Sequence, residues 1–255
     1  MEVRENVAYK GSEFAFQTVD GRKQLMHITQ CDRLGEGNFG EIFAVTLAVR
    51  EELHGILHDA GSIERALKVF HIQENARHAV AKHDFLRRYR FPLFEEYRED
   101  AGNRGCVLMP NGNRDGRVVV SWNRDSSAYE TLRKQRPLSC ESIRQTQASL
   151  LPYVHRATAF GFYVPPSAYF FHVPSDQQVH EHIPVSFDDT DEVDECFRGA
   201  DLVGFNVRGA QEALLALCTC GMQNTERNTA ASAIQKTCEQ WQEQIAWEIE
   251  RMMHC

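Results

Sequence analysis

The first half of the chain alternates between apolar and polar residues, which is the pattern of half-buried β-strands. In "RLGEGNFGEIFAVTLAV", residues 33–49, two such runs flank a turn that contains three glycines. The stretch 50–64 contains Gly and "DAGS" turn signals and predicts an interruption, after which "RALKVFHI", residues 65–72, predicts another strand. Residues 1–30 mix polar and apolar positions and predict an extended arm or an extra strand.

The period of the pattern changes after residue 72. The stretch 74–89 spaces its apolar residues at helical intervals. "CVLMP" and "VVVSW", residues 106–110 and 118–122, are short apolar runs joined by turn residues and predict a hairpin. The remainder is predicted to be mainly helical. The predicted helical segments are 126–157, 201–218 and 229–253, and the first of them has a break at Pro137. A β-rich first half followed by an α-rich second half predicts an α+β fold in two parts.

Composition narrows the classes of function. The chain has 255 residues, 42% of them hydrophobic and 25% charged, which is ordinary for a globular protein. The net charge of −8 disfavours a large nucleic-acid footprint, because that needs a concentrated positive face. A local basic patch in "FLRRYR", residues 85–90, stays open, although a solvated helix face is the favoured interpretation.

The sequence also suggests where the protein works. The first residues contain no apolar segment typical of a signal peptide, and no run approaches the roughly 20 apolar residues that cross a bilayer. We therefore expect no membrane contact and an intracellular, by default cytoplasmic, location, with organelle targeting left open. Metal sites at Cys218 and Cys220, or at His172, His180 and His182, are disfavoured against reduced thiols and solvated loop histidines.

The turn near residue 37 has the form G-x-G-x-x-G, with Gly35, Gly37 and Gly40. Alone this motif is weak evidence, since a plain hairpin turn also uses glycine. In a dinucleotide-binding unit a helix follows the motif, whereas here a second strand follows. This arrangement resembles the small lobe of a protein kinase, in which a glycine turn joins two strands and a lysine follows on a third strand, here Lys68.

The resemblance to the protein-kinase fold covers about residues 31–220. It implies a two-lobed α+β fold, with an N-terminal arm (1–30), a β-rich small lobe (31–122) and an α-helical large lobe with a C-terminal helix (123–255). It also implies that the three glycines and Lys68 hold nucleotide phosphates. Asp84 is the implied ion-pair partner of Lys68, where the family uses Glu.

The same resemblance shows that the catalytic groups are missing. Laid over H-R-D-L-x-x-x-N, "YVPPSAYF" puts Tyr163 in the His place, Pro165 in the catalytic Asp place and Phe170 in the Asn place. In "PVSFDD", Ser186 stands where the D-F-G Asp is expected, and Phe187 matches its Phe. Pro and Phe can neither accept a proton nor bind Mg²⁺.

A shifted alignment leaves an alternative open. Asp188 or Asp189 then becomes a ligand for Mg²⁺, which prefers oxygen, with Asp176 as a further candidate carboxylate. The protein would then be an atypical active kinase or nucleotidyl transferase that uses ATP. The stretch between "SFDD" and "DLVGF" is short and lacks A-P-E, which argues against ordinary protein phosphorylation.

The favoured hypothesis is a pseudokinase that serves as a protein-binding, scaffolding or regulatory subunit. It requires no cofactor, binds ATP weakly if at all, and uses Mg²⁺ only in the alternative. A protein partner or multi-subunit assembly is expected. Trp241, Ile245 and Met252 share one face of the C-terminal helix, whereas Trp247 lies off that face and is the predicted partner contact.

Overall fold

In the computed structural model, the described residues are 9–18, 21–53, 56–99, 105–111, 117–120, 138–174, 182–192 and 200–253. The chain divides into two compact units, one of residues 1–84 and 93–115 and the other of residues 85–92 and 116–255. Strands dominate the first unit and helices the second, so the predicted α+β class is confirmed. The predicted lobe boundary at Trp122 lies outside the described residues.

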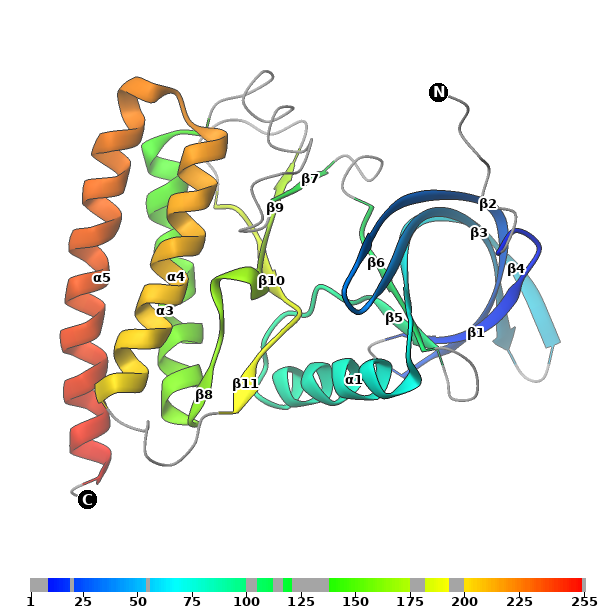
Figure 1. The fold of residues 1–255 in the computed structure, drawn as a ribbon, viewed down its shortest axis with the longest axis horizontal. Helices are drawn as coiled ribbons and strands as arrows, with labels where there is room; N and C mark the ends of the chain where they lie inside the picture. Colours follow the sequence, from blue (N-terminus) through cyan, green and yellow to red (C-terminus); the bar gives the residue numbers. More distant parts are fainter. Residues whose placement is uncertain are drawn as a thin grey trace. The chain divides into compact units, whose positions relative to one another are not determined.

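The first unit is built on a closed antiparallel barrel (Figure 1). Its strands are β1 (Glu13–Thr18), β2 (Lys23–Gly37), β3 (Gly40–Leu53), β4 (Ile56–Phe70), β5 (Tyr97–Glu99) and β6 (Cys106–Met109). Their order around the barrel is β1-β2-β3-β4-β6-β5. Strand β1 pairs with both β2 and β5 and closes the ring, so the N-terminal segment, expected as an extended arm or an extra strand, supplies barrel strands and is not a separate arm.

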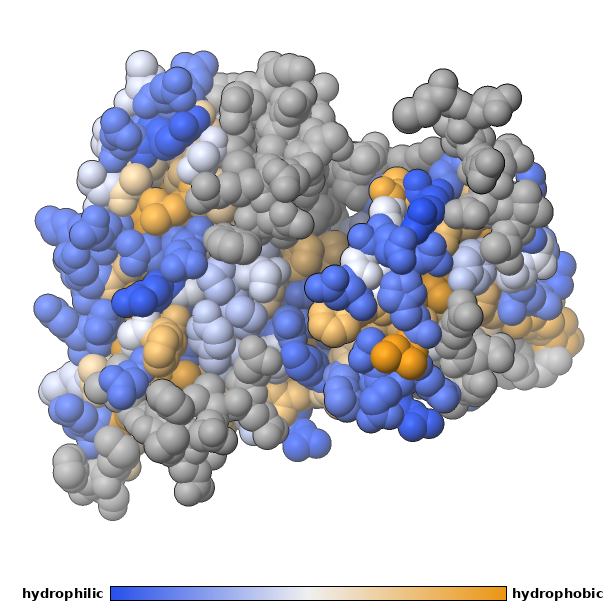
Figure 2. Space-filling model, in the orientation of Figure 1, coloured by the Kyte–Doolittle hydropathy of each residue, from blue (hydrophilic) through white to orange (hydrophobic). Residues whose placement is uncertain are grey.

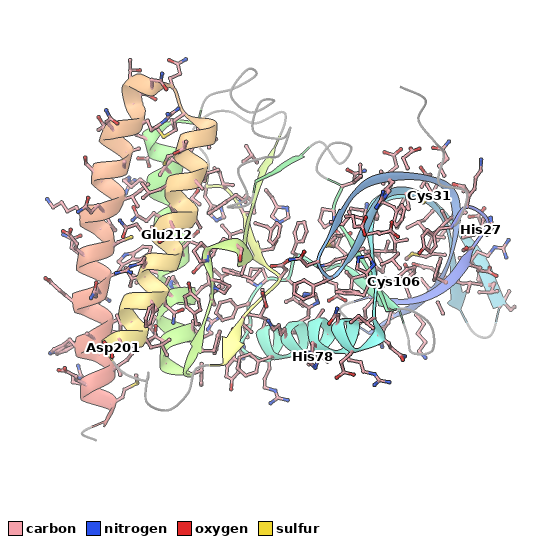
Figure 3. All side chains as sticks on the ribbon, viewed as in Figure 1. His27, Cys31, His78, Cys106, Asp201 and Glu212 are labelled. Carbon is pink, nitrogen blue, oxygen red and sulfur yellow. The ribbon has the colours of Figure 1, made fainter. Side chains whose placement is uncertain are left out.

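The barrel interior is the hydrophobic core of the first unit. Alternation along each strand directs every second side chain inward, and these side chains pack together; the largest of them are Phe16, Met26, Ile28, Phe43, Leu47, Leu67 and Leu108. Figure 3 shows Cys31 and Cys106 among the side chains that fill the barrel. Neither cysteine forms a disulfide, and burial raises the pKa of the Cys31 thiol.

The predicted interruption at residues 50–64 is wrong for most of its length. Strand β3 continues to Leu53 and β4 begins at Ile56, and these two residues pair across a long hairpin; the turn signal at Gly55 lies outside the described residues. The turn signals are absorbed by a register shift next to Val49 and by Gly61, whose φ is +94°. Residues 56–62 are exposed, so they carry no inside–outside alternation from which a strand could be predicted.

The predicted hairpin of residues 106–122 is also wrong. Strand β6 pairs with β4 and β5 in the barrel. Strand β7 (Arg117–Val120) pairs instead with β9 (Tyr169–Pro174) in the second unit, where Val119 lies opposite His172. A short apolar run identifies a strand but not its partner, and proximity in sequence was the wrong guide here.

The second unit packs three helices side by side with a small sheet (Figure 1). The helices are α3 (Cys140–Ala159), α4 (Ala200–Gly221) and α5 (Asn224–Met253). The strands are β8 (Phe162–Tyr163), β9, β10 (Val185–Phe187) and β11 (Asp191–Glu192), with a 3₁₀ turn η1 (Pro166–Ala168). The hydroxyl oxygen of Ser139 accepts a hydrogen bond from the Ser142 amide and caps α3.

Helix α1 (Gln73–Arg88) ends in a Schellman motif that has arginine where glycine is usual. The Phe91 amide donates to the Leu86 carbonyl at 3.0 Å, and the Arg90 amide donates to the Arg87 carbonyl at 2.9 Å. These bonds require Arg90 to adopt a φ of +60°, the left-handed region, which disfavours residues that have a Cβ. The end of α1 is therefore strained at Arg90.

Replacing Arg90 with glycine is expected to stabilise the protein. Glycine relieves the left-handed strain, but it also raises the entropy of the unfolded chain. Together these effects should raise the free energy of unfolding by about 0.5–1 kcal/mol. For a chain of this length the melting temperature should rise by about 2 °C, measured by calorimetry. Arg88→Gly, which places the same residue inside the helix, should lower it instead. A fall in both variants would contradict the strain at Arg90.

One further property of the helices bears on location. None of the helices in the described part of the chain is long and apolar enough to cross a membrane.

Candidate functional site

The glycine turn joins β2 to β3, with Gly37 opposite Gly40 in the register. A Cβ on Gly40 would lie 2.3 Å from the Val69 carbonyl oxygen, so barrel packing alone accounts for this glycine. A Cβ on Gly35 or Gly37 would meet nothing within 4 Å. These two positions leave open space beside the backbone, as an approaching phosphate would need.

Contacts from outside the turn hold it in place. The His71 amide, just after β4, donates to the Phe39 carbonyl at 3.0 Å, and the His71 imidazole lies 3.3 Å from the Gly37 carbonyl. The Arg33 guanidinium pairs with Glu36 and, at 3.1 Å, with Glu41. Two carboxylates therefore border the turn, and they repel a phosphate more than a neutral turn would.

Lys68 lies on β4, between Ile42 and Val107 in the register. Its ammonium lies 4.9 Å from the centroid of the Phe70 ring, a cation–π contact. Asp84 on α1 instead pairs with Arg98, at 2.8 Å. The structure thus gives the two members of the expected Lys68–Asp84 ion pair different partners.

Two residues that the kinase resemblance aligns with metal ligands lie opposite each other in the second unit. Phe170 on β9 is directly opposite Ser186 on β10, and neither side chain can ionise to hold Mg²⁺. The hydroxyl of Ser186 is buried and lies 2.5 Å from the imidazole Nε2 of His172. The position expected to hold a metal therefore contains a hydrogen-bonded serine–histidine pair.

The other face of β9 belongs to the core. Tyr169 and Phe171 are almost fully buried. Phe187 packs against Phe91, Tyr153 and Tyr169, with ring centroids 5.0–5.3 Å apart. Burial strongly raises the pKa of the Tyr169 phenol, so it stays neutral.

The segment that carries Pro165 is fixed by α4. The side chain of Asn206, fully buried, accepts a hydrogen bond from the Val164 amide at 3.0 Å and donates to the Phe162 carbonyl at 3.0 Å and the Thr158 hydroxyl at 3.2 Å. A Cβ on Gly209 would lie 2.7 Å from the Val164 carbonyl, so the helix and the segment are in close contact.

Sequence reasoning missed Asn206, although a signal existed. Leu202, Val203, Val207 and Ala210 form the buried stripe of α4, and Asn206 is a polar residue at a position on that stripe. A buried side-chain amide needs hydrogen-bond partners. The position of Asn206 on the buried stripe therefore predicted a neighbouring segment whose backbone N–H and C=O groups bind it.

Asp188 and Asp189 follow β10 directly and are half-buried. The Asp188 amide donates to the Ala168 carbonyl at 3.3 Å, and the Asp189 carboxylate accepts from the Thr190 amide at 2.9 Å. Among the described residues no group of three or more His, Cys, Asp or Glu side chains is arranged to hold a metal ion. Asp176 and His180 lie outside the described residues.

The predicted contact residue on α5 is exposed. Trp247 is 57% exposed, whereas Trp241 and Ile245 are buried in the core. The Arg251 guanidinium lies 4.8 Å from the centroid of the Trp247 ring. A depression of about 490 Å³, which we call the Trp247 depression, is lined by Trp247, Arg251, Met252, Glu248 and His155.

The setting of the Trp247 depression is polar. His155 on α3 pairs with Glu248 at 2.9 Å and ties α3 to α5 beside it. Along α5 most side chains in view are hydrophilic, with small apolar patches between them (Figure 2). An exposed aromatic ring bordered by charges is typical of a binding contact.

Neither a model of a known protein family nor a curated protein matches this chain. The function has to be argued from the geometry of the chain itself.

Proposed function

We propose that this chain is a catalytically inactive, kinase-like protein, a pseudokinase, that acts by binding a protein partner. The order of elements in the first unit supports the resemblance: a glycine turn between β2 and β3, Lys68 on β4, then α1, β5 and β6. This is the order expected for a kinase small lobe, with β1 as an addition.

One observation carries the proposal of inactivity. The cross-strand pair of Phe170 and Ser186 occupies the places of both metal ligands, and Pro165 occupies the place of the catalytic Asp. Phosphoryl transfer depends on positioned metal ions and a carboxylate that orients the nucleophile. A site without these groups has lost what accelerates the reaction, so binding is the use left to the fold.

The proposal of a protein partner has its own support. The Trp247 depression places an exposed indole ring beside a guanidinium, and Trp and Arg are enriched at interface hot spots. Aspartate-dependent transfer of phosphate remains the competing function, since Asp188 and Asp189 emerge next to Ser186.

A transfer assay tests inactivity. We expect purified protein incubated with labelled ATP and either Mg²⁺ or Mn²⁺ to transfer no label to itself or to a generic acceptor protein. The control is the double variant Asp188→Ala and Asp189→Ala, which should behave identically. Metal-dependent label transfer that the double variant abolishes would establish the atypical enzyme instead.

A thermal-shift titration tests nucleotide binding separately. With two carboxylates beside the glycine turn and no metal ligands, ATP at millimolar concentration should raise the melting temperature by about 1–2 °C or less, equally with and without Mg²⁺. A large rise seen only with Mg²⁺ and ATP together contradicts this expectation.

A further inference from the structure

Four arginines gather where α1 ends. Arg87, Arg88 and Arg90 are exposed, and Arg156 reaches them from the last turn of α3. Its guanidinium donates to the carbonyls of Tyr89 and Arg90, at 2.9 and 3.0 Å, and so fixes the end of α1 to α3. All of these residues belong to the second unit, and we call these four the arginine surface.

Flat aromatic rings lie among these cations. Phe160, just after α3, is 55% exposed, and its ring centroid lies 4.4 Å from that of half-buried Tyr89. The viewed side of α1 is largely hydrophilic (Figure 2). The surface therefore combines exposed aromatic rings with several guanidinium groups. Aromatic residues and arginine are both enriched at protein–protein interfaces.

Two observations distinguish this surface from an ordinary solvated helix end. Arg90 keeps a left-handed φ of +60°, although glycine would remove the strain. The segment 85–92 contains three arginines and no carboxylate, in a chain whose net charge is −8. Arg90 is a positively charged residue at a strained backbone position, in a chain that is negative overall. This combination indicates that the arginine was selected for a contact that its side chain makes.

We propose that the arginine surface binds an acidic segment of a partner protein, a run of Asp and Glu side chains. The planar guanidinium matches a carboxylate with two parallel hydrogen bonds, which gives specificity as well as attraction. A nucleic acid fits less well, because its phosphates extend beyond four arginines onto a chain that is negative overall. The inference rests on the proposed binding function and names the chemistry of the partner.

The test uses a fluorescein-labelled polyglutamate peptide and fluorescence anisotropy with the full chain. Wild-type protein is expected to bind it, more weakly as salt rises. Arg88→Glu and Arg90→Gly should each weaken binding about tenfold or more, whereas Arg90→Lys, which keeps the charge but loses the two parallel hydrogen bonds, should weaken it less. Because Arg90→Gly is also expected to stabilise the protein, its loss of binding would not reflect unfolding.

Arg77→Glu is the matched control, since Arg77 is exposed on the same helix. It lies about 16 Å from Arg88 along the helix, beyond the screening length at physiological salt, so binding should change little. Unchanged binding by Arg88→Glu overturns the proposal, as does tighter binding of an oligouridylate of equal charge.

These outcomes are separate from those of the proposed function. Failure to bind polyglutamate would leave the transfer assay and the Trp247 depression unaffected. Label transfer from ATP would overturn inactivity whatever the arginine surface binds.

Discussion

The variant Asn206→Leu is expected to lower the free energy of unfolding of the second unit by about 3 kcal/mol or more. Leucine has the branched shape of asparagine but is larger and forms no hydrogen bonds, so overpacking adds to the loss. The Val164 amide and the Phe162 carbonyl would lose the partner that the Asn206 side chain provides inside the protein. Each buried backbone group left unsatisfied costs about 1–3 kcal/mol. Urea unfolding monitored by circular dichroism measures the loss.

Asn228→Leu supplies the matched control, because Asn228 is exposed on α5. The same chemical change there should alter the stability by no more than about 0.5 kcal/mol. Hydrogen exchange adds a local measurement: the Val164 amide should exchange much faster in Asn206→Leu. An undiminished stability in this variant would mean that Asn206 does not hold the Pro165 segment.

The variant Trp247→Ala is expected to reduce affinity for the protein partner about thirtyfold, a loss of about 2 kcal/mol, while leaving the melting temperature nearly unchanged. The ring is 57% exposed, so it contributes little to the core. In an interface it would bury its full area against the partner. Partners would be recovered from cell lysate with wild-type protein, identified, and titrated against both forms.

The control for Trp247→Ala is Phe205→Ala, which truncates another exposed aromatic residue, on α4. It should leave partner affinity unchanged. If no stable partner is recovered with the wild type, the binding function fails. If Trp247→Ala binds as tightly as wild type, only the placement of the contact on α5 fails.

Periodicity in the sequence predicted the elements better than their partners. The alternation in residues 40–49 and the helical spacing in 74–89 each appear in the structure as β3 and α1, because burial of one face leaves a periodic trace. Nothing local in "VVVSW" indicated that β7 pairs with β9, since the pairing joins residues more than fifty positions apart. Strand partners depend on the whole chain and leave no periodic signal.

The candidate site shows the same limit. The sequence predicted that Trp247 is exposed, because it lies on a different face of the helix from Trp241 and Ile245. Such a prediction needs only the periodicity of one helix. The partners of Asp84 and Lys68 could not be predicted that way. Asp84 pairs with Arg98, and the Lys68 ammonium contacts the Phe70 ring. Which partner each charge takes depends on distances between separate elements. Likewise Gly40 looked like a phosphate-loop glycine, but its close contact is with β4.

The attachment of the glycine turn to residue 71 has a kinetic consequence. A loop that is free in solution must lose conformational entropy when it closes over a ligand, and its motion can limit the rate of association. Here Phe39 is already hydrogen-bonded to His71, and Arg33 is already paired across the turn. Any molecule that meets this turn encounters a preorganised surface, so its arrival and departure would be governed by diffusion and contact strength rather than by the opening of a flap.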